Sequence, residues 1–239
     1  MPDYKSPENI NALRGAINNL CEEYREMLLS LAESPQTQKR SALIYYWLRD
    51  YKNYLKNEAS FKCNYLPAYQ RGNIVNINFG FNVGSELGGL HYAVVLTNSG
   101  RNNPNLIVAP MTSAKNRSTN KYEIEIGDAL YQRVYGKHLG LRDSLKDRLS
   151  HMENNGIEND DTIQQILSRL DQLQKIGRKL QVLKHGSIIN ISQVRVVNKM
   201  RVTDPQHRLD VLYGITLSDK ELDLIDEKLI THMTKPKKT

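Results

Sequence analysis

Hydrophobic residues follow a helical pattern through the first 60 residues of the chain. Ser6 is a suitable N-cap, and Pro7 suits the first helical position after it. Apolar residues then recur every three or four positions along one helix face: Ile10, Leu13, Ile17, Leu20, Tyr24, Met27 and Leu31. Pro35 ends this pattern, and a second one covers residues 39–58. The two patterns predict an N-terminal helical hairpin whose apolar stripes are packing surfaces.

From residue 71 onward the pattern becomes one of short strands. Val75, Ile77 and Phe79 alternate with polar residues, and a period of two indicates a half-buried β-strand. Five more stretches have strand character: 93–96, 106–109, 122–126, 187–191 and 194–197. An all-β block of short strands is typical of a small barrel or sandwich.

A helical region interrupts this β block. Leucine and isoleucine recur at helical spacing from about residue 139 to residue 181. We therefore expect an inserted helical hairpin within residues 129–183. Ser218 and Glu221 form the capping box of a last helix, which a basic tail at 235–239 follows. The predicted fold class is α+β.

The composition is that of an ordinary globular protein, because 39% of the 239 residues are hydrophobic and 25% are charged. This excludes collagen-like, mucin-like and mostly disordered chains. No apolar run approaches the length of a membrane span, so we expect no membrane partner, and no signal peptide is expected. The two cysteines, Cys21 and Cys63, form neither a disulfide framework nor a zinc site. A reducing cytoplasm is therefore the expected compartment.

The charge balance suggests a class of partner. Lys and Arg number 33 against 26 Asp and Glu, which gives a net charge of +7. A basic balance favours polyanionic partners such as nucleic acid, or an acidic protein. The same charge also suits a surface that is merely solubilising, and charge alone leaves both interpretations open.

The candidate chemistry gathers between and after two predicted strands. A loop with three glycines, at residues 84–89, lets backbone amides approach a ligand closely, although it also suits a plain hairpin connection. His91 follows it, and histidine is the side chain that ordinarily titrates near neutral pH. Thr112 ends a strand, where its hydroxyl can hydrogen-bond a phosphate oxygen or simply form a turn. The basic residues Lys115 and Arg117 follow.

Nucleotide-binding and metal-binding motifs are missing from the sequence. It has no phosphate-binding P-loop, no Rossmann glycine fingerprint, no H-E-x-x-H and no CxxC. The six histidines do not cluster at metal-ligand spacing. We therefore expect no cofactor and no metal site.

Five segments in a fixed order carry a family resemblance: residues 71–75, 84–89, 93–98, 106–112 and 186–201. Together they resemble the MazF/PemK toxins of bacterial toxin–antitoxin systems, over roughly residues 70–128 and 184–234. The resemblance implies an SH3-like small β-barrel with a C-terminal helix. It also implies a bacterial, cytoplasmic, metal-independent endoribonuclease that cuts single-stranded RNA, forms a homodimer and binds a cognate antitoxin.

The resemblance divides the chain and implies a site. Residues 1–69 form a helical extension, and 70–234 form the family domain with its insert. Thr112 takes the position of the family's catalytic threonine. His91 takes the position of its usual catalytic arginine, which is a departure from the family pattern, because histidine titrates and arginine does not. The helical additions also lie outside the pattern of the short toxins.

The predicted reaction is attack of the RNA 2′-hydroxyl on its own phosphate. His91 is the candidate acid or base, and Thr112 with loop amides near Ser85 holds the phosphate oxygens. Glu86 is a candidate second proton carrier, or equally a loop residue that bonds backbone amides. The candidate RNA-binding residues are Arg71, Ser85, Gly88, Gly89, Lys115, Arg117, Ser187, Gln193, Arg195 and Lys199.

Two alternative functions remain open at this point. A related toxin family with the same barrel poisons DNA gyrase and does not cut RNA, although Thr112 and the glycine loop argue against that function here. The second alternative is a nucleic-acid-binding or antitoxin-binding module with weakened catalysis. The histidine at position 91 is the best support for that second alternative.

Overall fold

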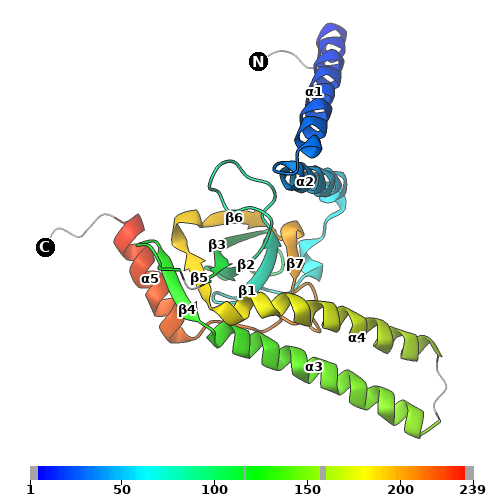
Figure 1. Cartoon of the computed structure of the whole chain (residues 1–239), viewed down its shortest axis with the longest axis vertical. Coiled ribbons are helices and arrows are strands. Elements are labelled where there is room, and N and C mark those ends of the chain that lie inside the picture. Colours follow the sequence, from blue (N-terminus) through cyan, green and yellow to red (C-terminus); the bar gives the residue numbers. More distant parts are fainter. Residues whose placement is uncertain (1–4, 116, 157–159, 235–239) are drawn as a thin grey trace, which may run out of the picture. The chain divides into compact units, whose positions relative to one another are not determined.

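A computed structural model describes residues 5–115, 117–156 and 160–234 (Figure 1). The chain divides into two compact units, Met1–Ser60 and Phe61–Thr239. The predicted basic tail at 235–239 lies outside the described residues. None of the described helices is both long and apolar enough to cross a membrane.

The first unit contains two helices, α1 (Pro7–Glu33) and α2 (Gln38–Asn57). The predicted N-cap is confirmed, since the hydroxyl of Ser6 accepts a hydrogen bond from the amide of Asn9 at 3.3 Å. Both helices lie within a residue or so of their predicted bounds. Local capping and spacing therefore define these elements well.

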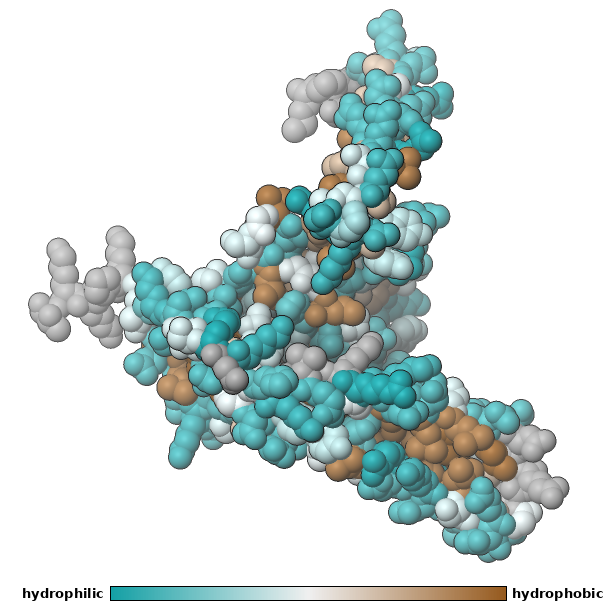
Figure 2. All heavy atoms as spheres, in the orientation of Figure 1, coloured by the Kyte–Doolittle hydropathy of each residue, from teal (hydrophilic) through white to brown (hydrophobic). Residues whose placement is uncertain are grey.

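The predicted hairpin packing of this unit is only partly realised. The hydroxyl of Ser41 donates to the carbonyl of Leu28 at 2.8 Å, which ties α2 to the last turns of α1. The two helices do not run side by side along their lengths (Figure 1), and α1 buries none of its residues. Figure 2 shows hydrophobic side chains on α1 where it approaches α2. Most of the apolar stripe on α1 thus has no partner within this unit.

The second unit is built on a seven-stranded sheet in which all pairs are antiparallel. Its strands are β1 (Ile74–Asn78), β2 (Leu90–Val95), β3 (Asn105–Ser113), β4 (Glu123–Gly127), β5 (Ser187–Asn190), β6 (Arg195–Asn198) and β7 (Val202–Asp204). The strand order is β4-β5-β3-β2-β1-β7, and β6 pairs with β3. Among the described residues no pairing joins β4 to β7. The α+β class is confirmed, but the sheet is open and a closed barrel is not confirmed.

The alternation of side chains explains how both faces of the sheet are covered. Val75 and Ile77 of β1 belong to one buried cluster, with Val95 of β2. Ile74 of β1 and Val94 of β2 belong to the other cluster, which lies under the helices. Successive residues of a strand point to opposite faces, so these central strands are buried on both sides.

Three helices cover the second cluster: α3 (Ala129–Asn154), α4 (Asp160–Leu180) and α5 (Asp219–Met233). The base of the predicted inserted hairpin joins the core through Leu130 and Leu173, which are fully buried. Nη2 of Arg133 in α3 donates to both carboxylate oxygens of Glu221 in α5, at 2.7 and 2.8 Å. The predicted capping box at Ser218 is confirmed. The insert is therefore anchored both to the core and to the last helix.

Asp204, the last residue of β7, makes stability depend on pH. Burial raises the pKa of its carboxyl from 3.8 to about 6. Between these values the folded protein binds more protons than the unfolded chain, so the free energy of unfolding falls as pH rises from about 4 to 6. The contribution of this group is up to about 3 kcal/mol.

We expect Asp204→Asn to remove this pH dependence, as measured by urea unfolding at pH 4, 5, 6 and 7. The wild type should lose stability relative to the variant as pH rises, by up to about 3 kcal/mol. Asp161→Asn, on the exposed start of α4, is the matched control and should leave the wild-type profile unchanged. A constant difference between wild type and Asp204→Asn across this range would contradict the assignment.

Candidate functional site

A pocket of about 600 Å³ lies where β2, β3 and β5 meet. Its lining residues are Asn76, Leu90, His91, Tyr92, Met111, Thr112, Ser113, Lys115, Arg117, Leu183 and Ser187. Two of the three predicted catalytic residues, His91 and Thr112, therefore lie in one pocket. Three predicted RNA-binding residues, Lys115, Arg117 and Ser187, line it as well.

The strand register brings His91 and Thr112 together. Ala93 of β2 is paired with Pro110 of β3, and continuing this register by two residues sets His91 opposite Thr112. The Nδ1 atom of His91 lies 3.1 Å from the carbonyl oxygen of Met111. A carbonyl only accepts, so this hydrogen bond requires a proton on Nδ1. In the neutral imidazole, Nε2 is then the basic nitrogen.

Arg117 is oriented toward Thr112 by an acidic partner. Its guanidinium makes two hydrogen bonds to Glu123 of β4, at 2.7 and 2.8 Å, and Nη2 lies 3.4 Å from Oγ1 of Thr112. Glu123 is buried, and the hydrogen bonds from Arg117 hold the pKa of its carboxyl below its ordinary value. The Arg117 side chain itself stays 44% exposed. A fixed, accessible guanidinium thus lies beside the threonine hydroxyl.

Ser187 adds a polar group at the base of the pocket. It is paired with Ser113 across β5 and β3, and it is 1% exposed. Its hydroxyl has no hydrogen-bond partner within the described part of the chain. A buried hydroxyl without a partner costs free energy, so one that lines a pocket suits a ligand or water oxygen.

Lys115 follows β3 in a left-handed backbone conformation, with φ of +44°. This conformation is uncommon for residues other than glycine. It belongs to the short connection after β3, in which the amide of Ala114 donates to Gly186 at 3.0 Å. The connection sets both Lys115 and Arg117 at the rim of the pocket.

The glycine loop is held by Gln193. The side-chain amide of Gln193 donates to the carbonyl of Ser85 at 3.1 Å, and its oxygen accepts from the amide of Leu87 at 2.6 Å. A Cβ atom on Gly88 would lie 2.7 Å from the carbonyl oxygen of Gly80, so this position needs glycine. Glycine at these positions therefore permits the close backbone packing of the loop.

Two predicted loop residues lie near this clamp and outside the pocket. Gly89 has a φ of +82°, and its amide donates to Gly80 at 2.6 Å. Glu86 is exposed and is not among the residues that line the pocket. The structure therefore does not bring Glu86 together with His91 and Thr112.

The other predicted cations contact the protein frame. Arg71 pairs with Asp226 of α5 at 2.5 Å and donates to the carbonyl of Leu96. Arg195 lies over the ring of Phe79, with its guanidinium carbon 5.2 Å from the ring centre. None of these groups lines the pocket around His91.

The position of Lys199 disagrees with its predicted role as an anchor for an RNA phosphate. Its side chain is fully buried, and its Nζ donates to the carbonyl of Gly100 at 2.7 Å. Burial lowers the pKa of its ammonium group. An RNA phosphate cannot reach this group in the described conformation, so Lys199 stabilises the fold instead.

Sequence reasoning missed three polar residues of the pocket, Asn76, Tyr92 and Ser113. Asn76 and Tyr92 are paired across β1 and β2. The alternation along β1 marks Asn76 as facing away from the neighbouring Val75 and Ile77, which was a usable signal. Burial raises the pKa of the Tyr92 hydroxyl to about 12, so it stays protonated at neutral pH and can donate a hydrogen bond. Among the described residues, no group of three or more His, Cys, Asp or Glu is arranged to hold a metal ion.

Comparison with known proteins supports the resemblance seen in the sequence. A family model described as PemK-like, MazF-like toxin of type II toxin-antitoxin system matches residues 70–173. This match contains β1 to β4, α3 and part of α4, and it includes His91, Thr112 and Arg117. A search of curated proteins finds no match to the chain.

Proposed function

Because residues 70–173 match the model of the PemK-like, MazF-like toxin family of type II toxin–antitoxin systems, we propose that this chain is an endoribonuclease toxin. It cuts single-stranded RNA in the bacterial cytoplasm, without a metal ion, and a cognate antitoxin restrains it. The open antiparallel sheet corresponds in this proposal to the small SH3-like barrel of the family. The observation that supports catalysis best is the pocket that His91, Thr112 and Arg117 share.

The proposed reaction begins at His91. Its Nε2 accepts the proton of an RNA 2′-hydroxyl, while the hydrogen bond from Nδ1 to Met111 keeps the ring in place. The freed 2′-oxygen attacks the adjacent phosphorus, and the bond to the 5′-oxygen breaks. The imidazolium then returns this proton to the departing 5′-oxygen. The products are a 2′,3′-cyclic phosphate and a 5′-hydroxyl end.

Thr112 and Arg117 stabilise the negative charge that develops on the phosphate during this step. The guanidinium is already oriented by Glu123, so it does not reorganise when the charge appears. The hydroxyl of Thr112 lies beside it and donates to a phosphate oxygen. Ser187 and Lys115 provide further donors at the base and rim of the pocket.

This function is tested by incubating the purified chain, freed of antitoxin, with a long defined RNA in EDTA. Discrete cuts that end in 2′,3′-cyclic phosphates support the proposal. Salt-dependent binding of RNA without cuts between pH 5 and 9 would instead indicate a binding module. An assay of DNA gyrase inhibition would then test the remaining alternative.

We also propose that the chain is a homodimer that pairs through α1. The apolar residues of α1 recur at alternating spacings of three and four, which is the seam of a coiled coil. Its first two heptads place Ile10 and Ile17 at one seam position and Leu13 and Leu20 at the other. This choice favours two-stranded pairing. All four side chains are exposed, and α1 buries none of its residues.

We expect Leu13→Asp with Leu20→Asp to convert a dimer into a monomer, because four carboxylates would then meet in an apolar seam. Multi-angle light scattering of the purified chain measures the mass. The matched control is Asn11→Asp with Asn18→Asp, which adds the same charges to exposed positions off the seam and should leave a dimer. A mass that the seam variant does not change would contradict pairing through α1.

A further inference from the structure

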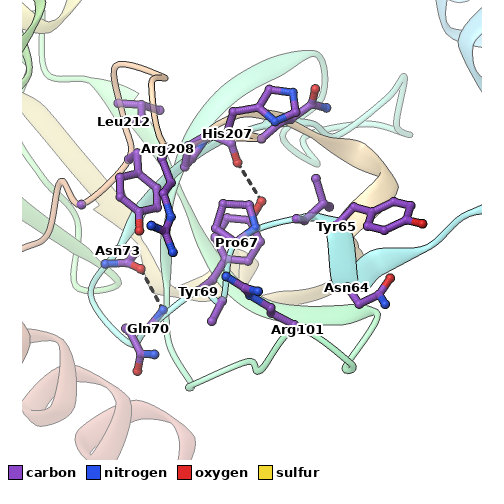
Figure 3. Close-up of a pocket in the computed structure, with 16 residues that line it drawn as sticks. Asn64, Tyr65, Pro67, Tyr69, Gln70, Asn73, Arg101, His207, Arg208 and Leu212 are labelled. Carbon is purple, nitrogen blue, oxygen red and sulfur yellow. Dashed lines mark hydrogen bonds between the residues drawn. The ribbon is translucent and has the colours of Figure 1, made fainter.

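A second pocket, also of about 600 Å³, lies on the Phe61–Thr239 unit and shares no lining residue with the pocket around His91. Three segments form it: residues 64–73 before β1, Arg101 in the connection from β2 to β3, and residues 205–214 between β7 and α5. Figure 3 shows these segments facing one another across the pocket. Neither the sequence motifs nor the family match assigns a role to it.

The pocket offers two uncommitted guanidinium groups. Arg101 and Arg208 are both exposed, and among the described residues no hydrogen bond or ion pair engages either side chain. Figure 3 shows Arg208 extending beside Asn73, while Arg101 lies below Pro67. Guanidinium groups donate several hydrogen bonds in a planar fork that matches phosphate oxygens.

Among the described residues that line the pocket, none carries a carboxylate to neutralise these cations. Two acidic groups act on Tyr69 of the pocket wall, Asp204 and Asp210. Asp204 accepts a hydrogen bond from the amide of Leu212 at 3.2 Å. Asp210 accepts hydrogen bonds from the amides of Gln206 and His207 and pairs with Arg169 at 3.3 Å. Its charge is therefore already engaged. His207 adds a further imidazole to the lining. The pocket consequently favours an anionic ligand.

Aromatic rings and amides make the pocket more than an anion site. Tyr65 is 76% exposed at the rim, and Nζ of Lys62 lies 5.9 Å from the centre of its ring. A planar base can stack on this exposed ring. Tyr69 is fixed in the wall, because its hydroxyl donates to the carbonyl of Pro205 at 2.7 Å. The side-chain oxygen of Asn73 accepts from the amide of Gln70 at 2.8 Å, which leaves its NH2 group to donate.

We propose that this pocket binds a nucleotide. The phosphate lies on the guanidinium groups of Arg101 and Arg208, and the base stacks on Tyr65. The ligand is either a free 5′-mononucleotide or one nucleotide of an RNA strand, since both present the same phosphate and base. The proposal does not depend on the ribonuclease function, because the two pockets have no residue in common.

The test is isothermal titration with each of the four 5′-mononucleotides, the matching nucleosides, inorganic phosphate and short single-stranded RNAs. All titrations use the His91→Ala variant. Its slow cleavage keeps the RNA intact while binding is measured. Binding of mononucleotides identifies a free nucleotide as the ligand. Binding of RNA alone, sensitive to the pocket variants below, identifies a nucleotide of a strand.

We expect Arg208→Ala and Arg101→Ala each to weaken binding by about tenfold or more, since each removes a charged hydrogen-bond donor. Tyr65→Leu should weaken it by roughly fivefold to a hundredfold through lost stacking. Arg148→Ala removes the same charge from the exposed face of α3 and should bind as the parent does. All four substitutions are at exposed positions, and thermal unfolding verifies that each variant is folded.

Two results would overturn the proposal. One is equal binding of all ligands by the parent, Arg101→Ala and Arg208→Ala, or no binding by any of them. The other is binding of inorganic phosphate as tight as that of nucleotides, with no effect of Tyr65→Leu, which would reduce the pocket to a simple anion site. Absence of RNA cleavage by the wild-type chain, with nucleotide binding intact, would contradict the ribonuclease proposal and leave this one standing.

Discussion

Replacing His91 by alanine is expected to lower the rate of RNA cleavage by about 10²- to 10⁴-fold, the usual contribution of a positioned acid–base group. Among the described residues that line this pocket, His91 carries the only imidazole, the side chain that most often serves as an acid or base in enzymes. Its Nδ1 is engaged by Met111, so the variant removes Nε2, the nitrogen that acts as the base in the proposed reaction. The measurement is single-turnover cleavage of an RNA that carries one mapped site.

Two further variants separate chemistry from packing at this position. His91→Gln keeps a side chain that can donate to Met111, yet it has no basic nitrogen, so it should be as slow as His91→Ala. His151→Ala removes an exposed imidazole from α3 and should cleave at the wild-type rate. A His91→Ala protein that cleaves as fast as the wild type would show that another group moves the proton.

Replacing Thr112 by valine is expected to slow cleavage by about 10²- to 10³-fold, as the loss of one donor to a developing oxyanion does in other enzymes. Valine keeps the shape of threonine and removes only the hydroxyl. Thr112→Ser restores the hydroxyl and should recover most of the rate. Equal rates for wild type and Thr112→Val would remove the hydroxyl from the mechanism.

A double-mutant cycle with Arg117→Lys tests whether the two groups act together. Lysine keeps the positive charge but cannot make both hydrogen bonds to Glu123 and also reach Thr112. We expect the combined effect of Thr112→Val and Arg117→Lys to be smaller than the product of the single effects, because both stabilise the same charge. Independent, multiplicative effects would place the two groups at different points of the reaction.

Local signals in the sequence predicted much of the fold. The cap at Ser6 and the capping box at Ser218 defined helix starts correctly, because each depends on residues three positions apart. Strict alternation around Val75 likewise identified β1. The first turns of α3 were missed by periodicity, since Gly136 and two tyrosines obscure the helical pattern there. β7 has only three residues and gives no periodic signal.

The family resemblance assigned His91 and Thr112 to one site, and the strand register of the structure brings these two residues together. The roles of single cations were harder to predict, because their partners lie far away in sequence. Arg71 meets Asp226, and Lys199 meets Gly100, across 155 and 99 residues respectively. Composition alone cannot distinguish such fold-stabilising cations from ligand-binding ones. Arg117 is the opposite case, since Glu123 lies only six residues away and orients it at the pocket.

The claim that the RNA's own 2′-hydroxyl is the nucleophile is tested most directly by removing that one oxygen from the substrate. Once a cleavage site is mapped, an RNA is synthesised with a single 2′-deoxynucleotide 5′ to that bond, and cleavage is followed in EDTA beside the all-RNA strand. The account predicts that the deoxy-substituted strand stays intact at this bond while it still binds. Cleavage of that bond at a comparable rate would contradict the mechanism, because the attacking group would then have to come from elsewhere.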